Sequence, residues 1–278
     1  MNTSAIIAIS VLSIIALGLS LSWLLGKQHS QQQYAGLNTL KQLKNLLVAL
    51  QKHRGLSSAI LKGNTQAEAE LATQQQQIRR YQSTLCEDQF IAEQARWDSF
   101  SQHWQSLQHS WQNNNLENNI AQHSLMIKNL LFLAQDLAGF YSLANLSKQH
   151  KNIDFLWFEL LETAESIGQA RALGSGLAAA NQSSSVERIR LAFLHNKIAQ
   201  IDAHSLNHFA DSFIPQDPSY QPLLEKLLQT IQLELINKPR PTINVADYFQ
   251  QASAVLDGLY QLFDAGIAHL EANQTTKH

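Results

Sequence analysis

A charged residue lies on the apolar face of the helix that we expect over residues 37–61. Steps of three and four residues place one set of side chains on that face: Leu40, Leu43, Leu47, Leu50, Arg54, Ser57 and Leu61. This spacing is typical of the core-facing stripe of an amphipathic helix, so Arg54 is predicted to point inward. Because a guanidinium stays protonated inside proteins, the fold must supply it with a carboxylate or a bound anion. The small residues that follow Arg54 leave room for either.

A second arginine occupies a similar position in a helix expected over residues 152–181. Its apolar face carries Ile153, Leu156, Leu160, Ala164, Ile167, Arg171, Gly174 and Ala178. Glycines surround this arginine, and each costs about 1 kcal/mol in a helix interior, so their number indicates close backbone approach or a cavity. Neither arginine has an acidic residue three or four positions away on its own helix. Each is therefore predicted either to pair with a carboxylate from another helix or to bind an anion.

The two arginines together suggest a binding site for a small oxyanion. If their helices face each other, two planar guanidinium groups converge on one inter-helix pocket and hold the anion by two-point, charge-assisted hydrogen bonds. The small residues beside them complete the predicted site. The candidate ligand-binding residues are Arg54, Ser57, Ser58, Arg171, Gly174 and Ser175.

The remaining pattern predicts an all-α fold made of two stacked or fused four-helix bundles. Only 11 Gly and 5 Pro occur in 278 residues, which favours long helices. Aromatic and leucine residues at heptad spacing are predicted to be core: Trp97, Phe100, Trp104, Leu107 and Trp111. Further helices are expected over residues 65–112 (interrupted near 86–88), 116–146, 186–213, 220–237 and 245–270.

The N-terminal stretch from Ala5 to Leu25 is apolar and carries no charge, which predicts one transmembrane anchor over residues 1–26. A juxtamembrane segment (27–34), an all-helical domain (35–272) and a tail (273–278) would follow. Small residues at every fourth position, Gly18, Ser22 and Gly26, favour a homodimer in the membrane. The lysines after the span place the soluble part in the cytoplasm by the positive-inside rule.

Several functional classes are excluded or lack support in the sequence. A net charge of −2 without a dense basic run argues against nucleic-acid binding. The single Cys86 excludes an internal disulfide framework. His204 and His208, with Asp211 nearby, are one helical turn apart, but a third metal ligand is not visible. We find no catalytic motif, so we expect neither an enzyme nor a cofactor or metal site.

Four stretches carry a family resemblance: QKHRGLSSAIL (51–61), ESIGQARALGSGLA (165–178), ERIRLAFLHNKI (187–198) and ADYFQQASAVLDGLYQLFD (246–264). They resemble the nitrate- and nitrite-sensing domain of bacterial receptors and of a nitrate-responsive transcription antiterminator, over about residues 35–272. The resemblance implies a helical double bundle that binds nitrate or nitrite between helices through arginines, which match Arg54 and Arg171 here. The family commonly has an acidic residue where this chain has His53, which leaves the charge around Arg54 one unit more positive.

The preferred hypothesis is a receptor for nitrate or nitrite, anchored in the bacterial inner membrane, that signals by conformational change. No output module follows the last expected helix, so a separately encoded signalling protein is the expected partner. A structural or adaptor bundle whose buried arginines form internal ion pairs is the alternative, and a sensor of another small anion is the third possibility. The first hypothesis requires Arg54 and Arg171 to approach each other without a carboxylate between them.

Overall fold

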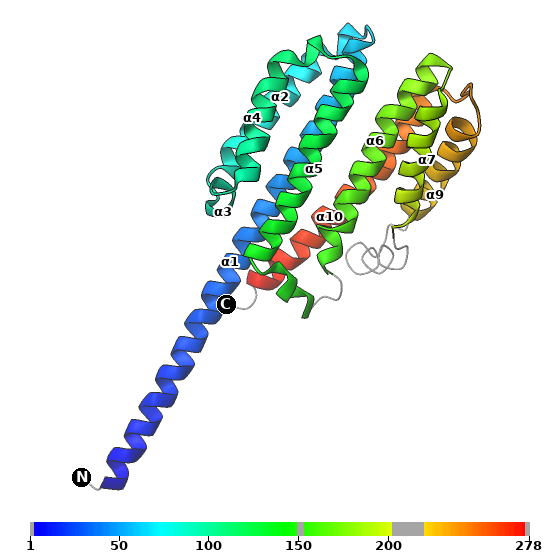
Figure 1. Cartoon of the computed structure of the whole chain (residues 1–278). Coiled ribbons are helices and arrows are strands. Elements are labelled where there is room, and N and C mark those ends of the chain that lie inside the picture. The colour runs from blue at the N-terminus through cyan, green and yellow to red at the C-terminus, as the bar shows by residue number, and fades with distance from the viewer. Residues whose placement is uncertain (1–2, 149–152, 202–219, 276–278) are drawn as a thin grey trace.

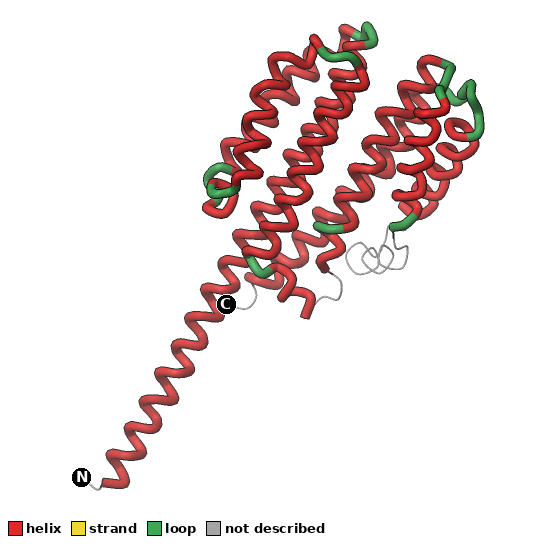
Figure 2. Tube along the Cα trace, viewed as in Figure 1, coloured by secondary structure: helices red, strands yellow, loops and turns green. Residues whose placement is uncertain are grey.

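The computed structural model describes residues 3–148, 153–201 and 220–275, with side chains over residues 12, 14–146, 153–201 and 221–272. Within these ranges every regular element is a helix, as Figure 2 shows. The prediction of an all-α fold is therefore confirmed.

The longest element is α1 (Thr3–Leu61), a single helix of 59 residues. Its N-terminal part projects away from the rest of the molecule, whereas its C-terminal part lies among the other helices (Figure 1). The change follows the sequence, because Leu40, Leu43, Leu47 and Leu50 are all buried. The helix ends just before Gly63, whose φ of +96° lies in the left-handed region that glycine tolerates.

The described part of the chain contains no helix that is both long and apolar enough to cross a membrane. The transmembrane anchor predicted over residues 1–26 is therefore not supported. Residues 1–2, and the side chains of residues 3–11 and 13, lie outside the described part of this segment.

The first group of helices packs on the C-terminal part of α1. It contains α2 (Glu68–Leu85), α4 (Ala95–Ser110) and α5 (Leu116–Phe140), with the short α3 (Gln89–Ala92) between α2 and α4. The break predicted near residues 86–88 is confirmed, because Asp88 caps α3 by accepting a hydrogen bond from the Ile91 amide. The aromatic stripe of α4 is buried as predicted, with Trp97, Phe100 and Trp104 each at most 3% exposed.

The second group contains α6 (Glu159–Ala180), α7 (Ser185–Ala199), α9 (Tyr220–Thr230) and α10 (Val245–Thr275), and α9 continues into the π-helical η5 (Ile231–Ile236). Helix α6 ends at Asn181, which adopts a left-handed conformation, and α7 begins with a Ser184 and Glu187 capping box. The helix predicted to reach residue 213 is described only to Ala199, and residues 202–219 lie outside the described part.

Short 3₁₀ helices occupy several of the connections. They are η1 (Thr65–Ala67), η2 (Trp111–Asn113), η3 (Leu143–Lys148) and η4 (Ile153–Leu156). The last of these corrects the sequence prediction, because the helix expected from residue 152 begins only at Glu159. The two groups of helices meet where α1 packs on α6 and α10, and α5 packs on α6. Both arginines singled out in the sequence lie along this junction.

Candidate functional site

A cavity of about 590 Å³ lies between α1, α6 and the beginning of α10. Three cationic side chains line it, namely Arg54 and Lys62 from the α1 end and Arg171 from α6. Small residues and Phe249 make up much of the remaining wall. Among the described residues that line the cavity, none is an aspartate or a glutamate. The cavity therefore has the charge pattern of a site for an anion rather than for a cation.

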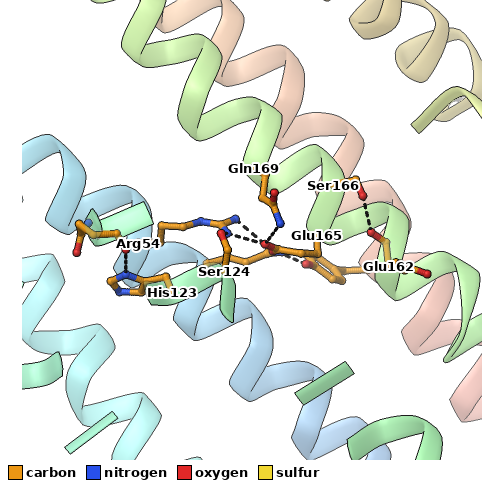
Figure 3. A network of polar contacts seen from close by, with 10 residues as sticks. Arg54, His123, Ser124, Glu162, Glu165, Ser166 and Gln169 are labelled. Atoms are coloured by element: carbon orange, nitrogen blue, oxygen red, sulfur yellow. Dashed lines mark hydrogen bonds and ion pairs between the residues drawn. The ribbon is translucent and has the colours of Figure 1, made fainter. Parts of the chain in front are cut away.

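Arg54 lines the cavity but is paired with a carboxylate from another helix. Only 1% of its side chain is exposed, and its Nη1 lies 2.6 Å from Oε1 of Glu165 on α6. Its Nη2 donates to the other carboxylate oxygen at 3.2 Å, and Nη1 also donates to Ser124 Oγ at 2.9 Å. Figure 3 shows the guanidinium pointing at Glu165 between α1 and α6. Arg54 thus has a two-point ion pair inside the protein.

Glu165 is the centre of this polar cluster. Besides Arg54, its carboxylate accepts hydrogen bonds from Gln51 and Gln169, each at 2.8 Å. Figure 3 shows the contact with Gln169. Glu165 is not among the residues that line the cavity, and it borders a separate pocket of about 440 Å³ between α5, α6 and α7. Buried charges are stable only when paired and hydrogen-bonded, and Glu165 meets both conditions.

Gly168 makes room for the Arg54 head group. A Cβ at this position would lie 2.8 Å from Arg54 Nη2 and 3.0 Å from Gln51 Nε2. Gly174, one turn beyond Arg171, instead allows α10 to pack closely, because a Cβ there would lie 2.5 Å from the Tyr248 ring. The glycines of this helix therefore serve both of the purposes considered from the sequence, namely space beside a charge and close helix packing.

Arg171 lies on the same cavity in a different environment. It is half-buried, its Nη1 donates to Ser253 Oγ at 2.9 Å, and its guanidinium carbon lies 4.8 Å from the centre of the Phe249 ring. Within the described part of the chain, it forms no ion pair with a carboxylate. Burial, and secondarily the positive charge of Arg54, lower the pKa of Arg171. Arg171 is thus a half-buried cation that no carboxylate of the described residues pairs with.

The six predicted site residues separate into two sets. Arg54, Ser58, Arg171 and Ser175 line the cavity, whereas Ser57 and Gly174 do not. Ser57 is buried, donates to the Arg54 carbonyl oxygen at 3.2 Å and accepts from Asn119. The Ser175 Oγ is buried and has no hydrogen-bond partner among the described residues, which is uncommon for a buried hydroxyl.

Sequence reasoning missed Glu165 because its pairing with Arg54 spans 111 residues and two helices. One signal was available, since Leu161, Glu165 and Gly168 follow each other at steps of four and three on a buried face of α6. An acidic residue on such a face needs a buried cation. The Arg54–Glu165 pair is what the alternative of internal ion pairing expects for Arg54, but Arg171 remains outside that explanation.

His53, which stands where the family commonly has an acid, belongs to a buried chain of hydrogen bonds. Its Nδ1 lies 2.7 Å from Nε2 of His123, whose Nδ1 lies 2.7 Å from the Asn119 carbonyl oxygen. A carbonyl can only accept, so His123 donates to Asn119 and His53 donates to His123, with both rings neutral. Burial lowers the pKa of His53 to about 4 and that of His123 well below its usual value. The side chain next to Arg54 is therefore uncharged at neutral pH.

The histidine pair considered in the sequence as a metal site lies in a part of the chain that the structure does not describe. His204, His208 and Asp211 lie outside the described residues. Within the described ranges, no group of three or more histidine, cysteine or acidic residues is placed to hold a metal ion.

Comparison with known proteins gives one match. A family model described as nitrate and nitrite sensing matches residues 45–271, a range that includes Arg54, Glu165 and Arg171. No curated protein and no solved structure matches the chain.

Proposed function

The chain belongs to the nitrate and nitrite sensing family, and we propose that it binds nitrate or nitrite in the cavity between α1, α6 and α10. The observation that carries the proposal is Arg171, a half-buried cation without a carboxylate partner among the described residues, on a cavity that no described acidic residue lines. A buried or half-buried charge requires compensation, and an anion from solution supplies it.

The chemistry of the lining suits a small planar oxyanion. The Arg171 fork matches two oxygens of such an anion by parallel N–H donation, while Arg54 on α1 adds positive potential that Glu165 lowers. The unpartnered Ser175 hydroxyl can donate to a further oxygen. The cavity is much larger than one nitrate ion, so water or helix closure must fill the rest of the space.

A structural or adaptor bundle stays the second candidate, and the Arg54–Glu165 pair favours it. Under this hypothesis the buried charges of Arg54 and Glu165 neutralise each other, and neither needs a ligand. It leaves two observations on the described residues unexplained, namely that none of them forms an ion pair with Arg171 and that none bonds to the Ser175 hydroxyl. Anion binding accounts for both.

The proposed output runs through α1. This helix carries Arg54 and continues without a break into the projecting N-terminal segment, so a change at the cavity can move that segment. Large apolar side chains of the segment are exposed, including Leu12, Ile14, Leu17 and Trp23. Exposed apolar surface of this extent is typical of contact with a membrane or a protein. Membrane anchoring, a homodimer and a separate signalling partner, without enzymatic activity, complete the proposal.

Calorimetric titration of the full chain with sodium nitrate, nitrite, chloride and sulfate tests the binding step. We expect saturable binding of nitrate or nitrite that is lost in R171Q. The matched control is R188Q, because Arg188 lies on α7 away from the cavity and donates to the Ser183 carbonyl oxygen. Absence of binding by every anion, or equal binding by R171Q and R188Q, would overturn the proposal. Cross-linking in membranes with and without nitrate tests the dimer and the partner.

A further inference from the structure

Among the cations that line the cavity, one is partly buried and has no ion pair within the described residues. Arg54 is buried and is neutralised by Glu165. Lys62 is exposed at the cavity edge, where water solvates its charge and its Nζ donates to the Gly176 carbonyl oxygen at 3.3 Å. Arg171 is the third cation, and it forms no ion pair within the described residues. The charge of Arg171 is therefore the one that a ligand in the partly buried site must compensate.

A second cavity beside Arg171 contributes no further net charge. Its volume is about 600 Å³, and its charged residues other than Arg171 are two lysines and two aspartates: Lys44, Lys52, Asp257 and Asp264. Lys44 is paired with Asp264 at 2.7 Å. The exposed Asp257 acts on Arg171 only through space, without an ion pair. The two positive and two negative charges of these four residues therefore cancel.

We propose that Glu165 sets the site to accept monovalent oxyanions and to reject divalent ones. The inference rests on the proposed function and assigns a specificity role to a residue that does not touch the ligand. A ligand of charge −1 neutralises Arg171 completely. A ligand of charge −2 would carry one uncompensated negative charge into a partly buried site, which is unfavourable.

The position of Glu165 allows this role without hindering the ligand. Its carboxylate is held by Arg54, Gln51 and Gln169, and Glu165 borders a different pocket. It therefore lowers the positive potential that Arg54 contributes but occupies no space in the cavity. A carboxylate inside the cavity would have repelled every anion, including a monovalent one.

The first test compares E165Q with E162Q by calorimetric titration of the full chain with sodium nitrate and sodium sulfate at constant ionic strength. Glu162 is the matched control, because it is an exposed acid on the same helix and pairs with Lys197 at 2.6 Å. We expect the affinity for sulfate relative to nitrate to rise at least about tenfold in E165Q, since the extra positive charge attracts a divalent anion twice as strongly. In E162Q this ratio should equal that of the wild type. A merely structural role of Glu165 would weaken binding of both anions without changing the ratio.

The second test adds a negative charge beside Arg171 and does not depend on the folding of E165Q. Ser253 accepts a hydrogen bond from Arg171, so an aspartate there supplies the missing carboxylate, and asparagine is the matched neutral variant. We expect S253D to bind nitrate at least about tenfold more weakly than S253N. An unchanged ratio of sulfate to nitrate affinity in E165Q, or equal nitrate affinities of S253D and S253N, would overturn the inference. Wild-type protein that binds sulfate as tightly as nitrate would also overturn it while leaving the site intact, whereas absence of all binding would defeat the proposed function.

Discussion

The environments of Arg54 and Arg171 differ although the two residues occupy similar places in the sequence. Both lie on an apolar helical face among small residues, and both line one cavity. Arg54 is almost completely buried and shares two hydrogen bonds with the Glu165 carboxylate. Arg171 is half-buried and has a hydroxyl and an aromatic ring as neighbours. The difference shows that an arginine on a core face has a carboxylate partner only where another helix provides one, as α6 does for Arg54 and as none of the described residues does for Arg171.

The largest expected effect follows from removing Arg54, and Arg171 provides the comparison. R54M would leave the buried Glu165 carboxylate without its cation, which should lower the free energy of unfolding by about 3–5 kcal/mol. R171M breaks no ion pair within the described residues, so we expect a loss of about 1 kcal/mol. Urea unfolding without nitrate measures both values. Equal losses of unfolding free energy in R54M and R171M would mean that the ion pair with Glu165 does not distinguish Arg54 from Arg171.

Acid should affect the surroundings of Arg54, where two neutral histidines are buried. Because the pKa of His53 is lowered to about 4, the unfolded chain binds more protons than the folded chain between that value and the ordinary histidine pKa. Stability is therefore complete above about pH 6.5 and falls as pH decreases toward 4, by about 3 kcal/mol from His53 alone.

Urea unfolding at pH 7.5 and pH 5 measures this loss in the wild type, in H53Q and in H109Q. Exposed His109 is the matched control, since its ring contacts only the Gln105 carbonyl oxygen of its own helix. The loss should be smaller in H53Q and unchanged in H109Q. An identical pH dependence in all three proteins would show that the buried histidines do not resist protonation.

Much of this fold was predictable from the sequence, because periodicity reports which face of a helix is buried. The inward direction of Arg54, the buried heptad stripe of α4 and the break at Asp88 follow from spacing and capping residues alone. The start of α6 was predicted too early, since residues 153–156 form a 3₁₀ turn that apolar periodicity cannot distinguish from an α-helix.

The partners of the site residues were less predictable. Contacts between helices depend on rotation and register, which one sequence does not specify. The Arg54–Glu165 and His53–His123 contacts join residues 111 and 70 positions apart. Ser57 was expected at the site because it shares a face with Arg54, yet its hydroxyl bonds to the backbone of its own helix. Helical spacing therefore indicated the arginines correctly as cavity-lining residues but could not tell which one already had a counterion.

Replacing each arginine by lysine should change a different property of the protein, namely nitrate affinity for Arg171 and stability for Arg54. In R171K the charge remains but the planar fork is lost, so nitrate binding should weaken at least about tenfold, or about 1.4 kcal/mol. In R54K the two-point contact with Glu165 is lost, and the main effect should be on the free energy of unfolding. Calorimetry with sodium nitrate and urea unfolding of both variants measure the two quantities. Unchanged nitrate affinity in R171K would contradict two-point binding at this residue.

The smallest expected effect concerns Phe249, whose aromatic ring lies beside the Arg171 guanidinium. The ring is 46% exposed, and the guanidinium carbon lies 4.8 Å from its centre. A cation over an aromatic face at an exposed site contributes about 0.5–1 kcal/mol.

F249L removes this attraction but also alters apolar packing, so the single variant does not isolate it. A double-mutant cycle of F249L and R171M does, because the packing change is common to both backgrounds. We expect F249L to cost about 0.5 kcal/mol more in unfolding free energy when Arg171 is present. Equal costs in the two backgrounds would mean that Phe249 is only a wall of the cavity, and that Ser253 alone orients the Arg171 guanidinium.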